Sequence, residues 1–190
     1  MKNNKNFFLK IIESQKKILN QTSLVDINNI INLVIRVLKN NKTVFWAGNG
    51  GSAAECQHMS AELIGRFKIN RRPLNSISLT VDTSAITAIA NDFGYEKVFS
   101  RQIEGLGSPG DILIALSTSG NSKNIIHVLK TCKKMRVKTI AFLGNNGGKC
   151  KKSADYKVII NSSNTARIQE LHQILLHYIC ESVERELFKK

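Results

Sequence analysis

The segment TVFWAGNGGSAAECQHMSAELIGRF, residues 43–67, indicates how the chain folds. TVFWAG is a short run rich in β-branched and aromatic residues, which is typical of a strand. The glycines of GNGG permit a tight turn, and the amphipathic residues that follow, from about Ser52, predict a helix. A strand, a glycine-rich turn and a helix in succession indicate a parallel α/β sheet.

The rest of the chain repeats this alternation. Strands are predicted for SISLTV (76–81), DILIAL (111–116), KTIAFLG (138–144) and YKVII (156–160). Helices are predicted over residues 85–90, 98–106, 122–135 and 165–187. The pattern predicts an α/β three-layer sandwich, with a mostly parallel sheet covered on both faces and ligands at the carboxyl ends of the strands.

We expect residues 1–190 to form one domain, because no linker or repeat interrupts the sequence. Residues 1–40 read as two N-terminal helices, and Ser23 and Asp26 are candidate starts of the second. Its apolar stripe consists of Ile27, Ile30, Ile31, Val34 and Leu38. Helices ahead of the first strand need a partner, so we expect them to pack on the domain or on a second subunit.

Composition narrows the class of protein. The chain has 28 Lys and Arg against 14 Asp and Glu, a net charge of +14, which could indicate nucleic-acid binding. The basic residues are dispersed and are not interleaved with aromatic residues, so we favour a solvated surface that attracts anions, and no nucleic acid. Neither a membrane span nor a signal peptide is evident, which predicts a cytoplasmic protein with no membrane partner. The four cysteines lack CxxC spacing and are interpreted as reduced and structural.

The first turn, Gly48 to Ser52, suits an anion because glycines let backbone N–H groups point at a ligand. It is neither a GxGxxG fingerprint nor a P-loop, so a dinucleotide site is not predicted. A glycine-rich turn alone is equally compatible with a plain loop.

The second turn, STSGNS, carries the hydroxyls of Ser117, Thr118, Ser119 and Ser122 between a strand and a helix. Hydroxyls and the free N–H groups of a helix start can hold a phosphomonoester. Ser119 or Ser122 could instead serve only as a helix cap. Two such turns in one small domain favour a sugar phosphate or a similar anion.

Acid–base groups are found on two predicted helices. His58 and Glu62 are four residues apart, so they share one helix face, although such pairs are also common on surfaces. The last helix embeds four polar residues in an apolar sequence: Gln169, His172, Gln173 and His177. We interpret His172 as a core or interface histidine with a polar partner, and His127 as a surface or packing residue.

The motifs GNGGSAA, HMSAELIGRF, TAIANDFGYEKVFSRQ, STSGNS and ARIQELHQILLH, in this order, resemble the sugar isomerase (SIS) domain. Within it they are similar to the bacterial phosphoheptose isomerases. The resemblance covers nearly the whole chain and implies a flavodoxin-like fold.

The resemblance also implies roles for residues. Glu62 and His177 match the catalytic base and acid, and one zinc ion per subunit would be held by His58, Glu62, Gln169 and His177. Residues that match sugar and phosphate contacts are Asn49, Gly50, Gly51, Ser52, Glu62, Asn91, Asp92, Ser117, Thr118, Ser119, Ser122 and Gln169.

The implied reaction converts sedoheptulose 7-phosphate into D-glycero-D-manno-heptose 7-phosphate, a step towards nucleotide-activated heptose, in a homotetramer. A carboxylate and an imidazole suit proton transfer through an enediol. The zinc expectation depends mainly on the resemblance, because residues 169 and 177 lie roughly 12 Å apart along a helix that rises about 1.5 Å per residue. Gln is also an unusual zinc ligand.

An SIS domain is also compatible with two other functions. One is a non-catalytic SIS protein that binds the replication initiator, but the relative of that kind lacks Glu and His at the positions of Glu62 and His177. The other is a sugar-phosphate-sensing regulator, which would usually carry an additional DNA-binding domain. The presence of both Glu62 and His177 favours the enzyme.

Overall fold

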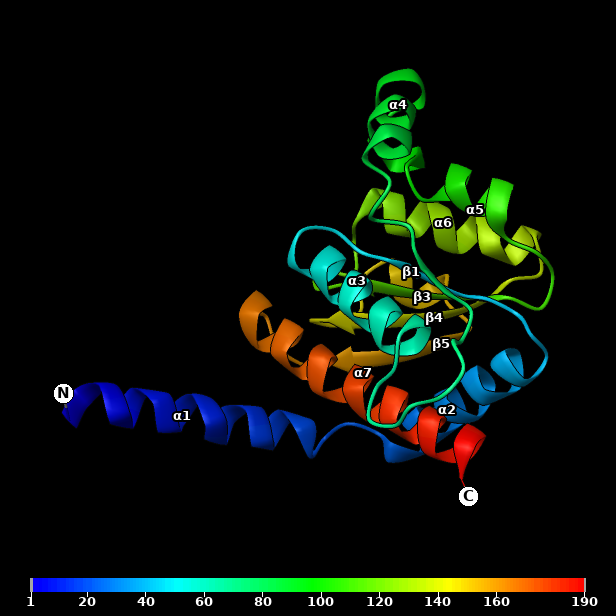
Figure 1. Ribbon diagram of the computed structural model, residues 1–190. Helices are drawn as coiled ribbons and strands as arrows, with labels where there is room; N and C mark the ends of the chain where they lie inside the picture. Colours follow the sequence, from blue (N-terminus) through cyan, green and yellow to red (C-terminus); the bar gives the residue numbers. More distant parts are fainter. Residues whose placement is uncertain (1, 190) are drawn as a thin grey trace.

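The computed structural model describes residues 2–189 and contains a five-stranded parallel sheet (Figure 1). Its strands are β1 (Val44–Ala47), β2 (Ser76–Ser78), β3 (Ile112–Ser117), β4 (Lys138–Gly144) and β5 (Tyr156–Ile160). They are arranged in the order β2-β1-β3-β4-β5. This is the strand order of a flavodoxin-like doubly wound sheet. From β1 the chain first adds β2 on one side and then adds β3, β4 and β5 on the other, so the switch point lies between β1 and β3.

Helices cover both faces of the sheet, which confirms the predicted α/β three-layer fold. One face carries α2 (Leu24–Lys39), α3 (Gly51–Ile64) and α7 (Thr165–Phe188), and α5 (Ser100–Leu106) and α6 (Lys123–Lys134) lie on the other (Figure 1). The helix α4 (Thr83–Phe93) stands beyond α5 and α6, at a distance from α3 and α7. None of the helices within residues 2–189 is long and apolar enough to cross a membrane.

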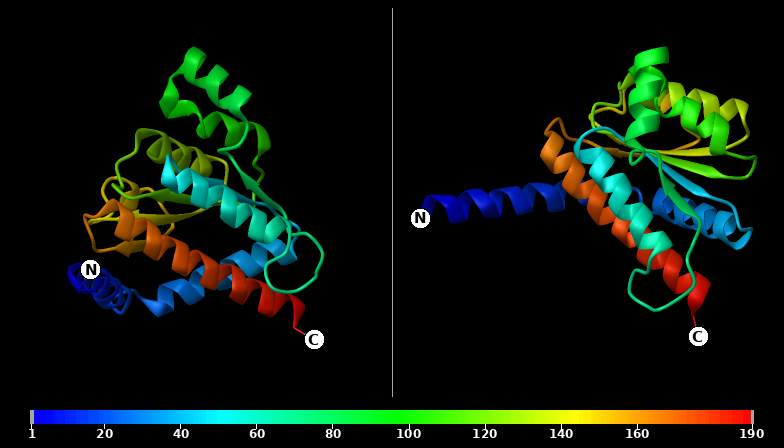
Figure 2. Two further views of the ribbon diagram at one scale, coloured as in Figure 1. Left: turned by 60° about the vertical axis from the view of Figure 1, so that its left-hand side comes forward. Right: turned by 45° about the horizontal axis from the view of Figure 1, so that its top comes forward.

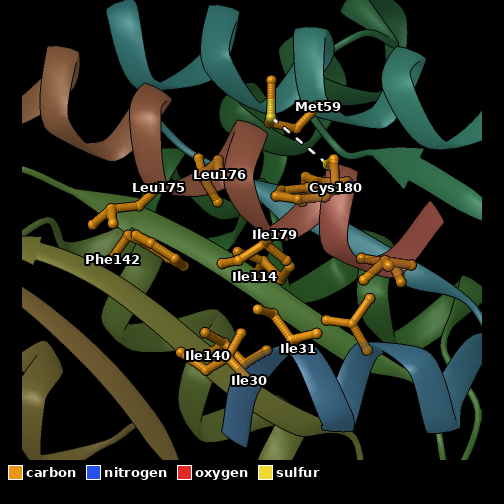
Figure 3. Close-up of a cluster of buried hydrophobic side chains, with 14 of the residues drawn as sticks. Ile30, Ile31, Met59, Ile114, Ile140, Phe142, Leu175, Leu176, Ile179 and Cys180 are labelled. Atoms are coloured by element: carbon orange, nitrogen blue, oxygen red, sulfur yellow. Dashed lines mark hydrogen bonds between the residues drawn. The ribbon is translucent and has the colours of Figure 1, made fainter. Parts of the chain in front are cut away.

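Two apolar cores lie on opposite sides of the sheet. The core under α2, α3 and α7 includes Ile30, Met59, Ile114, Phe142 and Ile179 (Figure 3). All residues of β1 and β3 are buried because each of these strands has neighbours on both sides and helices on both faces. The four cysteines are buried and unpaired, as expected for small apolar side chains.

The two N-terminal helices differ in how they pack: α2 is part of the core, whereas α1 (Lys2–Leu19) is largely exposed. Ser23 caps α2 by accepting a hydrogen bond from the Asp26 backbone N–H at 3.3 Å, and α2 packs into the core. The helix α1 points away from the body of the molecule (Figure 2). It leaves Phe7 and Phe8 exposed by 68% and 59%.

Some predicted boundaries were wrong. The strand predicted over 76–81 ends at Ser78, because β2 is an edge strand that pairs only with β1, and their register ends at Trp46 and Ser78. The helix predicted over 98–106 begins at Ser100, since the preceding residues form a short 3₁₀ turn, Tyr95–Lys97. The helix predicted over 85–90 is longer, because Asp82 caps it at 2.9 Å from the Ala85 nitrogen.

A buried carboxylate fastens the loop after α3 to α7. Glu184 is 3% exposed and accepts hydrogen bonds from the backbone N–H groups of Phe67, Lys68 and Ile69 at 3.1, 2.8 and 3.2 Å. It also accepts a hydrogen bond from Arg71 Nε at 3.0 Å. Burial would raise the pKa of Glu184, but these four donors outweigh it and lower the pKa.

We predict that Glu184→Gln lowers the free energy of unfolding by about 3 kcal/mol, because it leaves the Arg71 charge buried without its counter-ion. Urea unfolding at neutral pH measures this loss. The matched control is Glu181→Gln, which removes a more exposed pair with Lys68 and should cost at most about 1 kcal/mol. Equal losses in the two variants would contradict the role given to Glu184.

Candidate active site

The first turn joins the carboxyl end of β1 to α3. Gly50 has a φ of +55°, a conformation that favours glycine, and Gly51 opens the helix. A Cβ atom at Gly51 would collide with the Gln169 side chain. Glycine at this position therefore lets α7 approach the turn closely and places Gln169 beside it.

Asn49 in this turn is held by hydrogen bonds. Its amide nitrogen donates to Asn124 Oδ1 at 2.9 Å, and the Asn124 amide donates back to Asn49 Oδ1 at 2.7 Å. The Tyr95 hydroxyl donates to the same Asn49 oxygen at 3.2 Å. Asn124 is buried in the first turn of α6, so this reciprocal pair joins the glycine-rich turn to the helix that follows the serine-rich turn.

The second turn follows β3, which is the neighbour of β1, so the two turns lie at the same edge of the sheet. Ser122 occupies the capping position of α6, but its hydroxyl makes no capping bond and lies 3.2 Å from the Ser117 hydroxyl. Ser119 accepts a hydrogen bond from the Asn121 N–H at 3.1 Å. Ser122 is thus not a simple side-chain cap, and its hydroxyl remains beside that of Ser117.

The structure brings together His58 and Glu62 on α3 with His177 on α7. Ligand atoms of all three side chains lie within 4.8 Å of one another. His58 Nε2 lies 3.0 Å from Glu62 Oε1, and their side chains are 48% and 20% exposed. The rings of His58 and His177 meet edge to face with centroids 5.0 Å apart. A carboxylate and two imidazoles in this arrangement can move protons or hold a metal ion.

The structure adds two neighbours of this cluster to those predicted from the sequence. The Phe67 ring centroid lies 5.8 Å from that of His177. Gln173 of α7 lies with its amide nitrogen 2.9 Å from His58 Nδ1. The only sequence signal for Gln173 was its polarity within an apolar helix.

Other predicted site residues lie apart from the cluster in the single chain. Gln169 lies against the first turn, two helical turns before His177. Asn91 and Asp92 are exposed on α4, where the Asn91 amide donates to the Asp92 carboxylate at 2.8 Å. Their roles in binding stay predictions.

Two buried titratable groups lie near the site. Glu55, one turn before His58 on α3, is largely desolvated, which raises its pKa to about 7 although Ser52 donates to it. His172 is fully buried, and its Nε2 lies 3.2 Å from the Leu143 carbonyl oxygen. Burial lowers its pKa to about 4 despite that hydrogen bond, so His172 is the expected core histidine.

Known proteins with a similar sequence and fold belong to the SIS domain family. The SIS domain family matches residues 6–144. Two solved structures share the fold along nearly their whole lengths. The phosphoheptose isomerase of Neisseria gonorrhoeae has a TM-score of 0.89 and 35% identity, with 96% of this chain and 97% of that chain covered. The phosphoheptose isomerase of Francisella tularensis has a TM-score of 0.91 and 30% identity, with 97% of each chain covered.

Sequence similarity places the chain within one group of SIS-domain proteins, the phosphoheptose isomerases. The phosphoheptose isomerase of Akkermansia muciniphila is 48% identical over 163 residues, which cover 86% of each protein. The chain belongs to the phosphoheptose isomerase family of SIS-domain proteins and is therefore an enzyme of the isomerase class.

We predict that His172 makes stability fall in mild acid. The unfolded chain binds a proton on this histidine below its usual pKa of 6.5, whereas the folded chain does so only near pH 4. The free energy of unfolding should therefore fall by up to about 3 kcal/mol as the pH drops through this window.

Urea unfolding of His172→Gln and the wild type between pH 7 and pH 4 checks this prediction. The difference in unfolding free energy between the two proteins should change with pH in that window. His127→Gln, which replaces a partly exposed histidine, is the control. A constant difference for His172→Gln would overturn the prediction.

Proposed function

We propose that this protein isomerises D-sedoheptulose 7-phosphate to D-glycero-D-manno-heptose 7-phosphate, the first step towards nucleotide-activated heptose. The observation that carries the proposal is the meeting of Glu62 with His58 and His177 across α3 and α7. Family membership supports it, since the relatives are phosphoheptose isomerases.

The two turns are suited to hold the substrate. The phosphate can be held by hydrogen-bond donors alone, without a positively charged side chain. The donors available are the hydroxyls of Ser117 and Ser122 and the backbone N–H groups at the start of α6. Asn49, held by Asn124, can then present its polar atoms to sugar hydroxyls. Dispersed basic residues on the surface would attract the anionic substrate over longer distances.

Glu62 and His177 can perform the proton transfers. The Glu62 carboxylate takes a proton from C1 of the ketose and delivers a proton to C2, so that an enediol is the intermediate. The His177 imidazole moves protons between the two oxygens, O1 and O2. Each positioned group typically accelerates such a reaction about 10²- to 10⁴-fold.

The side chains also fit a zinc ion. Two imidazoles and one carboxylate are ligands that zinc prefers, and their atoms lie close enough for one ion after a small adjustment. In this proposal His58, Glu62 and His177 hold one zinc per subunit. Gln169 is the fourth ligand that the resemblance implies, and in the single chain its side chain lies against the first turn. The ion would supply a Lewis acid that stabilises negative charge on the enediolate.

We predict that Glu62→Gln and His177→Gln each lower kcat about 10²- to 10⁴-fold without unfolding the protein. Turnover of sedoheptulose 7-phosphate in deuterated water, with deuterium read at C2 of the product, measures the proton transfer. Glu104→Gln, which changes an exposed carboxylate on α5, is the control and should retain full activity. A fully active Glu62→Gln protein would sink the assignment.

We also propose a homotetramer in which other subunits cover the exposed parts of the site. The exposed apolar residues of α1 and the half-exposed His58 ring support this arrangement. Light scattering should then give four times the 21.2 kDa chain mass. The double variant Phe8→Asp and Ile12→Asp should dissociate the assembly, whereas Lys130→Glu on α6 should not. A monomeric wild type would contradict this proposal.

A further inference from the structure

Gln173 occupies a distinctive place on α7. It lies four residues after Gln169 and four before His177, so all three share one stripe of the helix. Its side-chain amide reaches across to α3, where the nitrogen lies 2.9 Å from His58 Nδ1. The contact joins residues 115 positions apart in the sequence.

Both ring nitrogens of His58 are engaged by side chains. Nε2 faces the Glu62 carboxylate at 3.0 Å, and an ionised carboxylate can only accept a hydrogen bond. Nε2 therefore carries the proton and donates, which leaves Nδ1 as the acceptor for the Gln173 amide. The His177 ring lies against the same imidazole, with the ring planes 78° apart.

We infer that Gln173 is a positioning residue that sets the orientation and the protonated nitrogen of His58 in the proposed active site. This inference rests on the proposed function. Gln173 contacts neither Glu62 nor the turns that are proposed to hold the substrate in any hydrogen bond found within residues 2–189. Its effect therefore passes through His58.

An amide suits this role because it offers a donor and an acceptor in one planar group. In the free protein the Gln173 N–H groups face the unprotonated Nδ1. A metal ion held through Nε2 would require the ring proton on Nδ1, and the Gln173 amide could then turn over to accept a hydrogen bond from it. Partners that bond the second nitrogen of a metal-binding histidine in this way commonly change metal affinity about 10- to 100-fold.

Two variants separate the donor and the acceptor of the Gln173 amide. Gln173→Met keeps the length of the side chain but removes donor and acceptor, while Gln173→Glu keeps only an acceptor. The matched control is Gln57→Met, since Gln57 is adjacent to His58 on α3 but donates to Thr80 at 3.1 Å. Thermal unfolding of each variant tests whether the fold is retained.

The readouts are the zinc dissociation constant, from competition with a coloured chelator, and the ¹⁵N shifts of the His58 ring. His58→Gln assigns those signals. Gln173→Met should weaken zinc binding about 10- to 100-fold and mix the two neutral forms of the ring, whereas Gln57→Met should change neither. Gln173→Glu should add a proton at Nδ1 in the free protein, because both ring nitrogens then face carboxylates, and it should bind zinc about as tightly as the wild type.

Unchanged zinc affinity and unchanged ring shifts in Gln173→Met would overturn the inference. A wild type that binds no zinc would remove zinc from the proposed function. If the His58 ring shifts still changed in Gln173→Met, that result would support the positioning role. Failure of the positioning role of Gln173 and failure of the proposed zinc site therefore give different results.

Discussion

The contact between α3 and α7 determines where the acid–base groups meet. The two helices run in the same direction, so contacts advance together along both: Gly51 with Gln169, His58 with Gln173, and residues 67–69 with Glu184. Beneath the site, Cys180 Sγ lies 4.0 Å from Met59 Sδ in the buried core (Figure 3). Glycine at position 51 and the small Cys180 side chain allow this close approach, and the Glu184 carboxylate fixes its far end.

The second constraint is the pairing of neighbouring strands. Because β1 and β3 are parallel and adjacent, their carboxyl ends bring the glycine-rich and serine-rich turns to one edge of the sheet. The Asn49–Asn124 pair then fixes the turns relative to one another. A substrate spanning both turns would meet polar groups that are already oriented, which lowers the entropic cost of binding.

Local sequence signals were sufficient for the sheet and for both turns, because hydrophobic runs and glycine positions act over a few residues. The His58–Glu62 pair was also predictable, since helical spacing alone places the two side chains together. The contact of Gln173 with His58 was not, because it depends on how α7 crosses α3. The distance of Asn91 from the cluster likewise depends on where α4 stands relative to the sheet, which no local pattern specifies.

We propose that the α3–α7 cluster is the catalytic centre of a zinc-dependent isomerase. The most direct test of this proposal is conversion of sedoheptulose 7-phosphate by the purified protein, followed by chromatography of the product, after treatment with a chelator and after zinc is returned. We expect conversion that the chelator abolishes and zinc restores. A folded, zinc-loaded protein that produces no heptose 7-phosphate would contradict it.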